Sequence, residues 1–182
     1  MPRGDATPER IRAAALALFA REGVAGTSLQ MIASELGVTK AAVYYHFRTR
    51  EAIVQDVLAP AFDGFADMVR DVREQPAGDR PRLLVHALAR QAVANRQLYA
   101  VVLQDVTAAQ LRRGSAEQLR TFRDLRDELV GDGADDRAHV RASIFLSGLM
   151  APAVDPDASH LSDEDLEAAI VEAGLGVLGL AP

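Results

Sequence analysis

The chain has 182 residues, of which 49% are hydrophobic and 25% charged, with a formal net charge of -6 and no cysteine. This composition indicates a globular protein and excludes disulfide bonds and thiolate metal sites. The four histidines do not fall into a metal-ligand spacing. The N-terminus has no apolar signal segment, and no apolar run reaches membrane-spanning length. We therefore expect a cytoplasmic protein with no metal, no cofactor and no membrane partner.

The first predicted helix begins near the N-terminus and has a complete set of start and stop signals. Thr7 can cap the exposed backbone N–H groups, and Pro8 suits the first helical position. Apolar residues follow at helical spacing, and Gly23 is expected to end the helix with a left-handed turn.

Two shorter helices follow and form a predicted helix-turn-helix. Ser28 caps the first of them, and Gly37 ends it. Thr39 caps the next, which runs to about Phe47. A short helix, a glycine-containing turn and a second short helix are the elements of this motif.

The third helix divides its residues between an inward and an outward face. At about 100° per residue, Val43 and Phe47 share the face that packs on the preceding helices. Ala41 and Tyr45 point away from that face, with Lys40 at the start of the helix. Small residues allow close approach to bases, and hydroxyl or ammonium groups bond phosphate oxygens. An alternative stays open, in which the tyrosine rings close a small three-helix core.

The charge distribution supports an interaction of the first segment with phosphates. Residues 1–50 hold seven basic and four acidic groups, a net charge of +3. The remaining 132 residues hold 13 basic and 22 acidic groups, a net charge of -9. A basic head on an acidic body fits a chain in which only the head meets nucleic acid.

The rest of the chain is predicted to be helical. A long helix is expected from Thr49 towards Glu74, with Pro60 kinking or interrupting it. Asp79 is expected to cap a helix that begins near Pro81. Further helices are predicted over residues 95–106, Thr107–Val130, Asp136–Met150 and Asp163–Leu180.

The last predicted helix carries a near-heptad apolar seam. Its residues Leu166, Ile170, Ala173, Val177 and Leu180 stand at offsets 0, 4, 7, 11 and 14. Such a seam packs against another helix. The partner is either a helix of the same chain or a helix of a second copy.

Two quoted segments resemble the DNA-binding head of the tetracycline-repressor (TetR) family. The stretch "TSLQMIASELGVTKAAVYYHFRTREAIVQDVL" (Thr27–Leu58) contains "IA", "GV" and "YxHF" followed by a basic residue and glutamate, all at the family's spacing. The stretch "RIRAAALALFAREGVAGTS" (Arg10–Ser28) resembles the family's first helix. Together they cover about the first third of the chain.

The resemblance implies an all-α fold, with an N-terminal three-helix helix-turn-helix head on a larger helical body. Residues 1–50 would form the DNA-binding domain, and residues 51–182 would bind an effector and form a homodimer. The expected function is a transcriptional repressor that a small-molecule effector releases from its double-stranded DNA operator. The outward face of the third helix and the resemblance together predict DNA contacts from Ser28, Thr39, Lys40, Ala41, Ala42, Tyr44, Tyr45, His46 and Arg50. Arg50 stands where the family usually has lysine.

The same resemblance supplies two further sets of candidate residues. The effector pocket would be lined by Phe65, Met68, His86, Tyr99, Leu103, Gln104 and Phe122. The dimer interface would contain Phe145, Leu149, Leu166, Ile170, Ala173, Val177 and Leu180. The alternative for each pocket residue is ordinary core packing, which is the more common role of such side chains, and the alternative for the seam is packing on its own chain.

Two alternatives to an effector-released repressor remain at this stage. One is a ligand-independent regulator or an activator with the same head. The other is a helical enzyme, although the sequence has no nucleophile–base motif, phosphate loop or metal cluster to support it. We therefore expect no catalytic residue.

Overall fold

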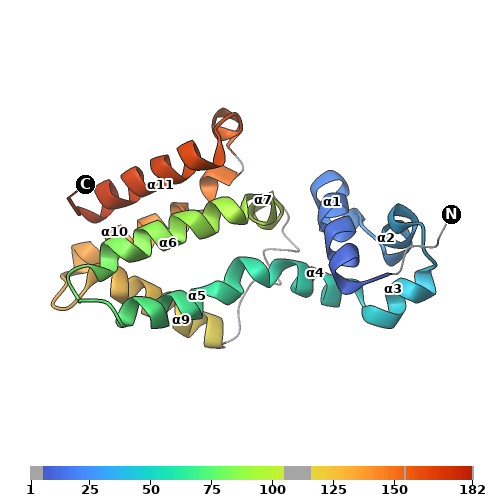
Figure 1. Cartoon of the computed structure of the whole chain (residues 1–182), viewed down its shortest axis with the longest axis horizontal. Coiled ribbons are helices and arrows are strands. Elements are labelled where there is room, and N and C mark those ends of the chain that lie inside the picture. The colour runs from blue at the N-terminus through green and yellow to red at the C-terminus, as the bar shows by residue number, and fades with distance from the viewer. Residues whose placement is uncertain (1–5, 105–115, 154, 182) are drawn as a thin grey trace. The chain divides into compact units, whose positions relative to one another are not determined.

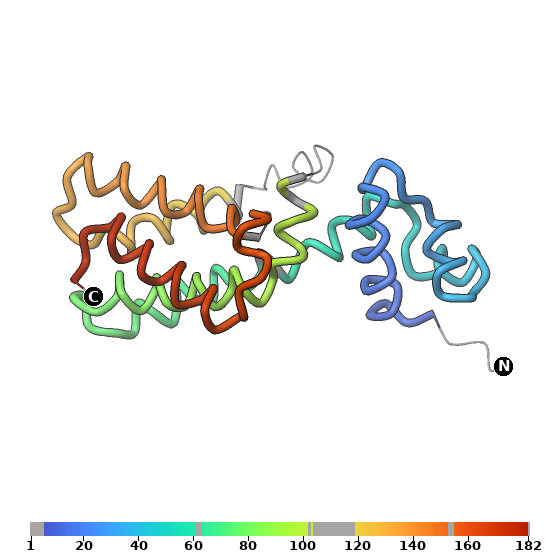
Figure 2. The backbone as a smooth tube through the Cα atoms, turned by 90° about the horizontal axis from the view of Figure 1, so that it is seen from above, coloured from blue at the N-terminus to red at the C-terminus, as the bar shows by residue number. Residues whose placement is uncertain are grey.

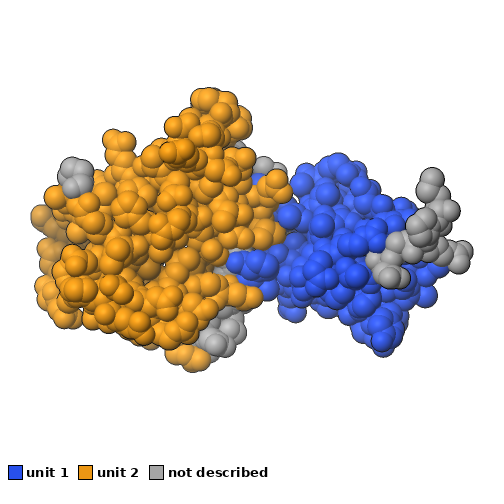
Figure 3. Space-filling view, in the orientation of Figure 1, with its two compact units in different colours: residues 1–60, 100–113 blue, residues 61–99, 114–182 orange. Residues whose placement is uncertain are grey.

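The computed structural model describes residues 6–104, 116–153 and 155–181, and the elements it shows there are helices (Figures 1 and 2). The predicted all-α fold, with an N-terminal helix-turn-helix and a helical body, is confirmed. Residues 1–60 and 100–113 form one compact unit, and residues 61–99 and 114–182 form another (Figure 3). The sequence placed a functional boundary at residue 50, and that division stays a prediction.

The head is the set of four helices α1 (Pro8–Gly26), α2 (Leu29–Leu36), α3 (Lys40–His46) and α4 (Arg50–Leu58). The body is the set α5 (Pro60–Arg73), α6 (Arg80–Ala94), α9 (Ala116–Val130), α10 (Asp136–Gly148) and α11 (Asp163–Leu178). Helix α7 (Arg96–Gln104) has residues in both units, and η1 (Ala151–Ala153) and η2 (Pro156–Ala158) lie between α10 and α11 in the chain. The predicted helix start at Thr107 lies outside the described residues.

Helix α1 begins and breaks where the sequence predicts. The Thr7 hydroxyl accepts a hydrogen bond from the backbone N–H of Arg10 at 3.4 Å, and Pro8 is the first helical residue. Gly23 leaves helical geometry at φ 74, a conformation that costs glycine little, and one more turn carries α1 on to Gly26. The hydroxyl of buried Thr27 donates to the Gly23 carbonyl at 2.9 Å, which fixes this break.

At the start of the body, the predicted break at Pro60 is confirmed and the predicted cap at Asp79 is not. Helix α4 ends at Leu58 and α5 begins at Pro60, so proline interrupts the predicted long helix. Asp79 does not cap α6 with its side chain, and that prediction is wrong. Its backbone is in the α-helical region, whereas a side chain that caps a helix usually projects from an extended residue.

The head has its own apolar core. Helix α1 packs against α2 and α4, and α2 packs against α3. Ile11, Ile32 and Ile53 come from three of these helices, and none of them is exposed to solvent. Burying a side chain of this size contributes about 1.5–3 kcal/mol, so the helices stabilise one another.

In the body, α6 packs against both α9 and α11, and α10 packs against the same two helices (Figure 1). Glu128 of α9 accepts a hydrogen bond from Arg73 of α5 at 2.6 Å and one from Arg80 of α6 at 3.5 Å. The Glu128 side chain is largely buried, so its two arginine partners offset the loss of hydration. This carboxylate therefore ties three helices together.

Helix α11 approaches its neighbours closely at one glycine. A Cβ atom added to Gly174 would lie 2.6 Å from Cε2 of Phe145 on α10 and 3.0 Å from Cγ1 of Val85 on α6. Real side-chain atoms do not approach so closely, so the absence of a side chain at Gly174 sets the distance between these helices. Gly176, two residues later, has no such neighbour within 4 Å.

We predict opposite effects of alanine at these two glycines. Gly176→Ala should raise the free energy of unfolding by about 0.5–1 kcal/mol, because alanine is the better helix former. The free energy of unfolding of Gly174→Ala should be about 1–3 kcal/mol lower than that of Gly176→Ala, because the added methyl group must displace Phe145 or Val85. Urea denaturation at equal chain concentration compares them, and equal stabilities would contradict the close packing at Gly174.

Candidate nucleic-acid interface

The recognition face, defined as Lys40, Ala41, Ala42, Tyr44, Tyr45 and His46, lies on the outer side of α3. Val43 is completely buried and Phe47, which ends the helix, is nearly so. Tyr44 is 45% exposed and Tyr45 75% exposed, so the tyrosine rings do not close the core of the head. Lys40, Ala41 and His46 are also exposed, and Ala42 is half-buried.

The turn before α3 is built as the sequence predicts. Gly37 adopts the left-handed conformation at φ 67 and closes α2, and the N–H of Val38 donates to the Ala33 carbonyl at 3.0 Å. The Thr39 hydroxyl caps α3 by accepting from Ala42 N–H at 3.2 Å. A seven-residue helix thus begins at a fixed point, and its outward side chains share one face.

Ser28 and Thr39 are the two predicted DNA contacts that also cap helices. The Ser28 hydroxyl accepts from the N–H of Met31 at 3.2 Å, at the start of α2. A hydroxyl that accepts a hydrogen bond still has a proton to donate. Both exposed hydroxyls can therefore cap their helices and donate to a phosphate oxygen at the same time.

The aromatic side chains of α3 form two separate pairs. The Tyr45 and His46 rings meet edge to face, with centroids 5.1 Å apart. The guanidinium carbon of Arg48 lies 5.1 Å from the centroid of the Tyr44 ring. Sequence reasoning did not select Arg48, although an arginine four residues after a tyrosine at the end of a helix is within reach of such a contact.

Arg50, the last predicted DNA contact, donates within the head. Its Nη1 donates to the backbone carbonyls of Ala25 at 3.0 Å and Val24 at 3.5 Å. Its Nη2 lies 3.5 Å from the carboxylate of Glu51. These contacts hold the start of α4 against the end of α1, and a phosphate contact from Arg50 stays a prediction.

Ion pairs brace the head at two further places. Arg12 of α1 pairs with Asp56 of α4, and Arg21 of α1 pairs with Glu35 of α2 at 3.2 Å. The hydrogen bond that Arg12 donates to the Asp56 carboxylate raises the pKa of Arg12 above its ordinary value. All four side chains are partly exposed, so the pairs serve more to orient the helices than to stabilise them.

The predicted effector-pocket residues are only partly brought together. The Phe65 and Phe122 rings meet edge to face, with centroids 5.6 Å apart, where α5 packs on α9. Tyr99 is completely buried, and burial raises its pKa to about 12, so the phenol stays neutral. Met68 and His86 are half-buried, whereas Leu103 is exposed, and the side chain of Gln104 lies outside the described residues.

The predicted dimer residues converge on an apolar groove between α10 and α11, with a volume of about 330 Å³. Six of the seven line it, namely Phe145, Leu149, Leu166, Ile170, Ala173 and Val177, but not Leu180. The first four are buried in the body and form the floor, whereas Ala173 and Val177 are exposed beside Ile144 and Gly148. Part of the near-heptad seam therefore packs on its own chain and part faces outward, and its packing on a second copy stays a prediction.

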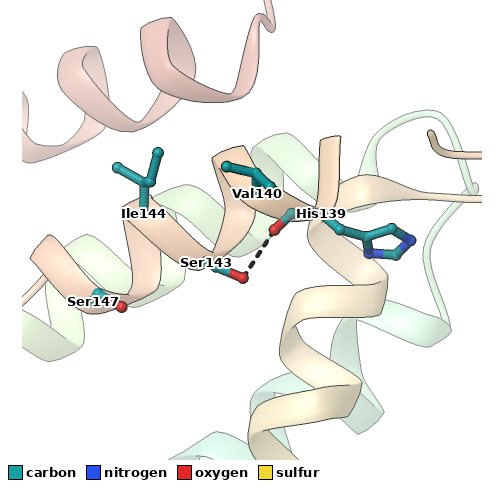
Figure 4. Close-up of a pocket in the computed structure, with 5 residues that line it drawn as sticks. All are labelled: His139, Val140, Ser143, Ile144 and Ser147. Atoms are coloured by element: carbon teal, nitrogen blue, oxygen red, sulfur yellow. Dashed lines mark hydrogen bonds between the residues drawn. The ribbon is translucent and has the colours of Figure 1, made fainter. Parts of the chain in front are cut away.

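The outer side of α10 continues this apolar face. A shallow hollow there is lined by His139, Val140, Ser143, Ile144 and Ser147 (Figure 4). Val140 and Ile144 project from the same side of the helix, and each is 57% exposed. The Ser143 hydroxyl donates to the His139 carbonyl at 2.9 Å, so this hydroxyl is already satisfied within α10. Ile144 belongs to both the hollow and the groove, which makes them one face.

Two further kinds of site, metal centres and membrane-spanning helices, concern the described part of the chain. No group of three or more His, Asp or Glu side chains there could hold a metal ion. None of the described helices is both long and apolar enough to cross a membrane.

The buried Val43, the capped turn and the exposed face of α3 define a helix-turn-helix protein. Comparison with known proteins shows which family this head resembles. Residues 11–57 match the family model of bacterial regulatory proteins of the tetR family. The chain is 35% identical over 74 residues to YerO of Bacillus subtilis, an uncharacterized regulator of the helix-turn-helix type, and this match spans 41% of the chain and 26% of YerO. Residues 11–57 thus carry a helix-turn-helix head of the tetR-family type, and the curated relatives that the chain resembles are transcriptional regulators of the helix-turn-helix type.

Solved structures extend the likeness to the whole chain. A transcriptional regulator from Rhodococcus sp. RHA1 is 26% identical, with a TM-score of 0.65, and the match covers 97% of this chain and 100% of that one. FadR of Bacillus subtilis, solved with stearoyl-CoA, has a TM-score of 0.66 at 18% identity and covers 96% of this chain and 100% of that one. The second likeness shows the fold alone.

Proposed function

We propose that the chain is a homodimeric, DNA-binding repressor of transcription that leaves its operator when a small molecule binds the body. The observation that supports this most is the exposed recognition face of α3 on a head held together by its own core. In this proposal the head binds DNA, and the body binds the effector and the second copy.

The recognition face suits the major groove of DNA. Ala41 and Ala42 are small enough for α3 to approach base edges and contact a thymine methyl group. Lys40 and the tyrosine hydroxyls can bond phosphate oxygens, which position a protein without reading sequence. The net charge of +3 over residues 1–50, against -9 over residues 51–182, favours approach to DNA through the N-terminal segment.

A second copy is the occupant that best fits the face made by α10 and α11. The face is apolar, helical and continuous over both helices, and its exposed side chains include Val140, Ile144 and Val177. Pairing α10 and α11 with their copies would bury these side chains in a bundle of four helices. A symmetric dimer would carry two heads to successive major grooves about 34 Å apart on a near-palindromic operator.

Release by an effector requires that the small molecule bind one conformer of the dimer more tightly than the other. FadR of Bacillus subtilis, which shares the fold, was solved in complex with stearoyl-CoA, so one protein of this fold binds a small molecule. Of the residues predicted to line an effector pocket in this chain, Phe65 and Tyr99 are buried. A reporter assay with and without the chain distinguishes this repressor from an activator.

Substitutions at Lys40 and Ala41 should distinguish phosphate contacts from base contacts. Duplexes that the full chain selects from fragmented genomic DNA serve as probes. Lys40→Ala should weaken binding about equally across these duplexes and reduce the salt dependence, since it removes a phosphate contact. Ala41→Ser should change the preferred bases instead. Equal loss of sequence preference from both variants would contradict the assigned roles, and failure to select any duplex would contradict DNA binding itself.

The second prediction concerns the dimer. Ile144→Asp should convert the chain to monomers in sedimentation equilibrium, because it would bury two uncompensated carboxylates at the interface. Leu83→Asp is the matched control, since Leu83 is exposed on α6 and does not line the groove. A dimer that persists in Ile144→Asp, or that both variants lose equally, would place the interface elsewhere.

The third prediction concerns release. In a screen of small molecules, a compound that raises the melting temperature of the chain should also weaken its binding to a selected duplex by about 5–150-fold, the usual range of coupling between two sites. Phe65→Ala should abolish both effects, whereas Leu83→Asp should leave them intact. Unchanged duplex affinity in the presence of every stabilising compound would favour a regulator that works without an effector.

A further inference from the structure

Arg48 is the first residue after α3 and its C-cap Phe47, and its side chain is exposed. Its guanidinium carbon lies 5.1 Å from the centroid of the Tyr44 ring, within the range of a cation–π contact. Among the described residues, no carboxylate lies within ion-pair distance of Arg48. The charge of Arg48 is therefore held on an aromatic ring of the recognition face and is not neutralised there.

Arg50 differs from Arg48 in the groups that its guanidinium meets. Arg50 donates to two backbone carbonyls at the end of α1 and lies beside the Glu51 carboxylate. A phosphate contact from Arg50 would compete with these hydrogen bonds, whereas one from Arg48 would break none. Two arginines two residues apart thus have different roles in the head.

We infer that Arg48, rather than Arg50, supplies the cation that binds a DNA phosphate at the C-terminal end of the recognition helix, with the Tyr44 ring as its platform. The inference rests on the proposed DNA-binding function and adds a residue and its orientation to it. Arg50 is then a positioning residue, which holds α4 against α1 and does not itself touch DNA.

The chemistry of the guanidinium group explains why this arrangement works. Guanidinium is planar and weakly hydrated, so it stacks on an aromatic face while its N–H edge stays available. That edge can bond two oxygens of one phosphate. Holding the long side chain on Tyr44 before DNA arrives lowers the conformational entropy lost on binding. The Tyr44 hydroxyl and Arg48 then serve neighbouring parts of the DNA backbone.

The dependence of affinity on salt concentration distinguishes a phosphate contact from a merely structural role. The full chain and its variants Arg48→Gln, Arg48→Lys and Arg50→Gln are titrated into a fluorescent duplex that the wild-type chain selects from a random library. For a dimer with two heads on the duplex, Arg48→Gln should reduce the slope of log affinity against log salt by about two. Between about 50 and 200 mM salt, the wild-type affinity should then fall about tenfold more than that of Arg48→Gln. Arg48→Lys should keep the wild-type slope, because it keeps the charge.

Arg50→Gln is the comparison variant, and it should keep the wild-type slope while lowering the melting temperature. A wild-type slope in Arg48→Gln, or a reduced slope in Arg50→Gln with Arg48→Gln unchanged, would overturn the inference while DNA binding stands. A wild-type chain that selects no duplex would instead overturn the proposed function.

A double-mutant cycle tests the platform separately. Tyr44→Phe keeps the ring, so the loss of affinity on changing Arg48 to Gln should be the same in Tyr44→Phe as in the wild type. Tyr44→Leu removes the ring, so the same change should cost at least twofold less affinity there. Equal losses in both backgrounds would show that Arg48 does not depend on Tyr44.

Discussion

The burial of Val43 and Phe47 is the constraint on which the head depends. A helix of seven residues is too short to be stable alone in water, so α3 exists because its inward side chains pack on the rest of the head. Val43 is the buried residue of α3, and Phe47 is its buried C-cap. The exposed side chains of α3 take no part in this packing, so the helix can present them to DNA.

The other features of the head serve to keep that short helix in place. Thr39 fixes where α3 begins, and Gly37 supplies the left-handed residue that turns the chain from α2 into α3. Arg50 and the Arg12–Asp56 pair attach α4 to α1 from opposite ends, so α4 and the recognition face are parts of one packed unit. Any displacement of α4 therefore displaces the recognition face with it, as long as these contacts hold.

Local chemistry made much of this predictable from sequence. The caps at Ser28 and Thr39 and the turn at Gly37 each depend on residues within a few positions of one another, and the structure confirms them. The misassigned cap at Asp79 shows the limit, because a suitable residue type does not fix the backbone angles that capping needs. The carbonyls that Arg50 meets lie 25 and 26 residues away, and no local pattern reveals such a partner. The groove has the same limit: the seam predicted its residues, but only packing determined which of them are buried and which face outward.

In the proposed complex, two copies of the chain present α3 to one double helix in register. Hydroxyl-radical footprinting of the full chain on a selected duplex tests this most directly. The account predicts two protected patches on one side of the duplex, with centres about one helical turn, or 10 base pairs, apart. A single protected patch, or protection spread evenly along the duplex, would contradict it.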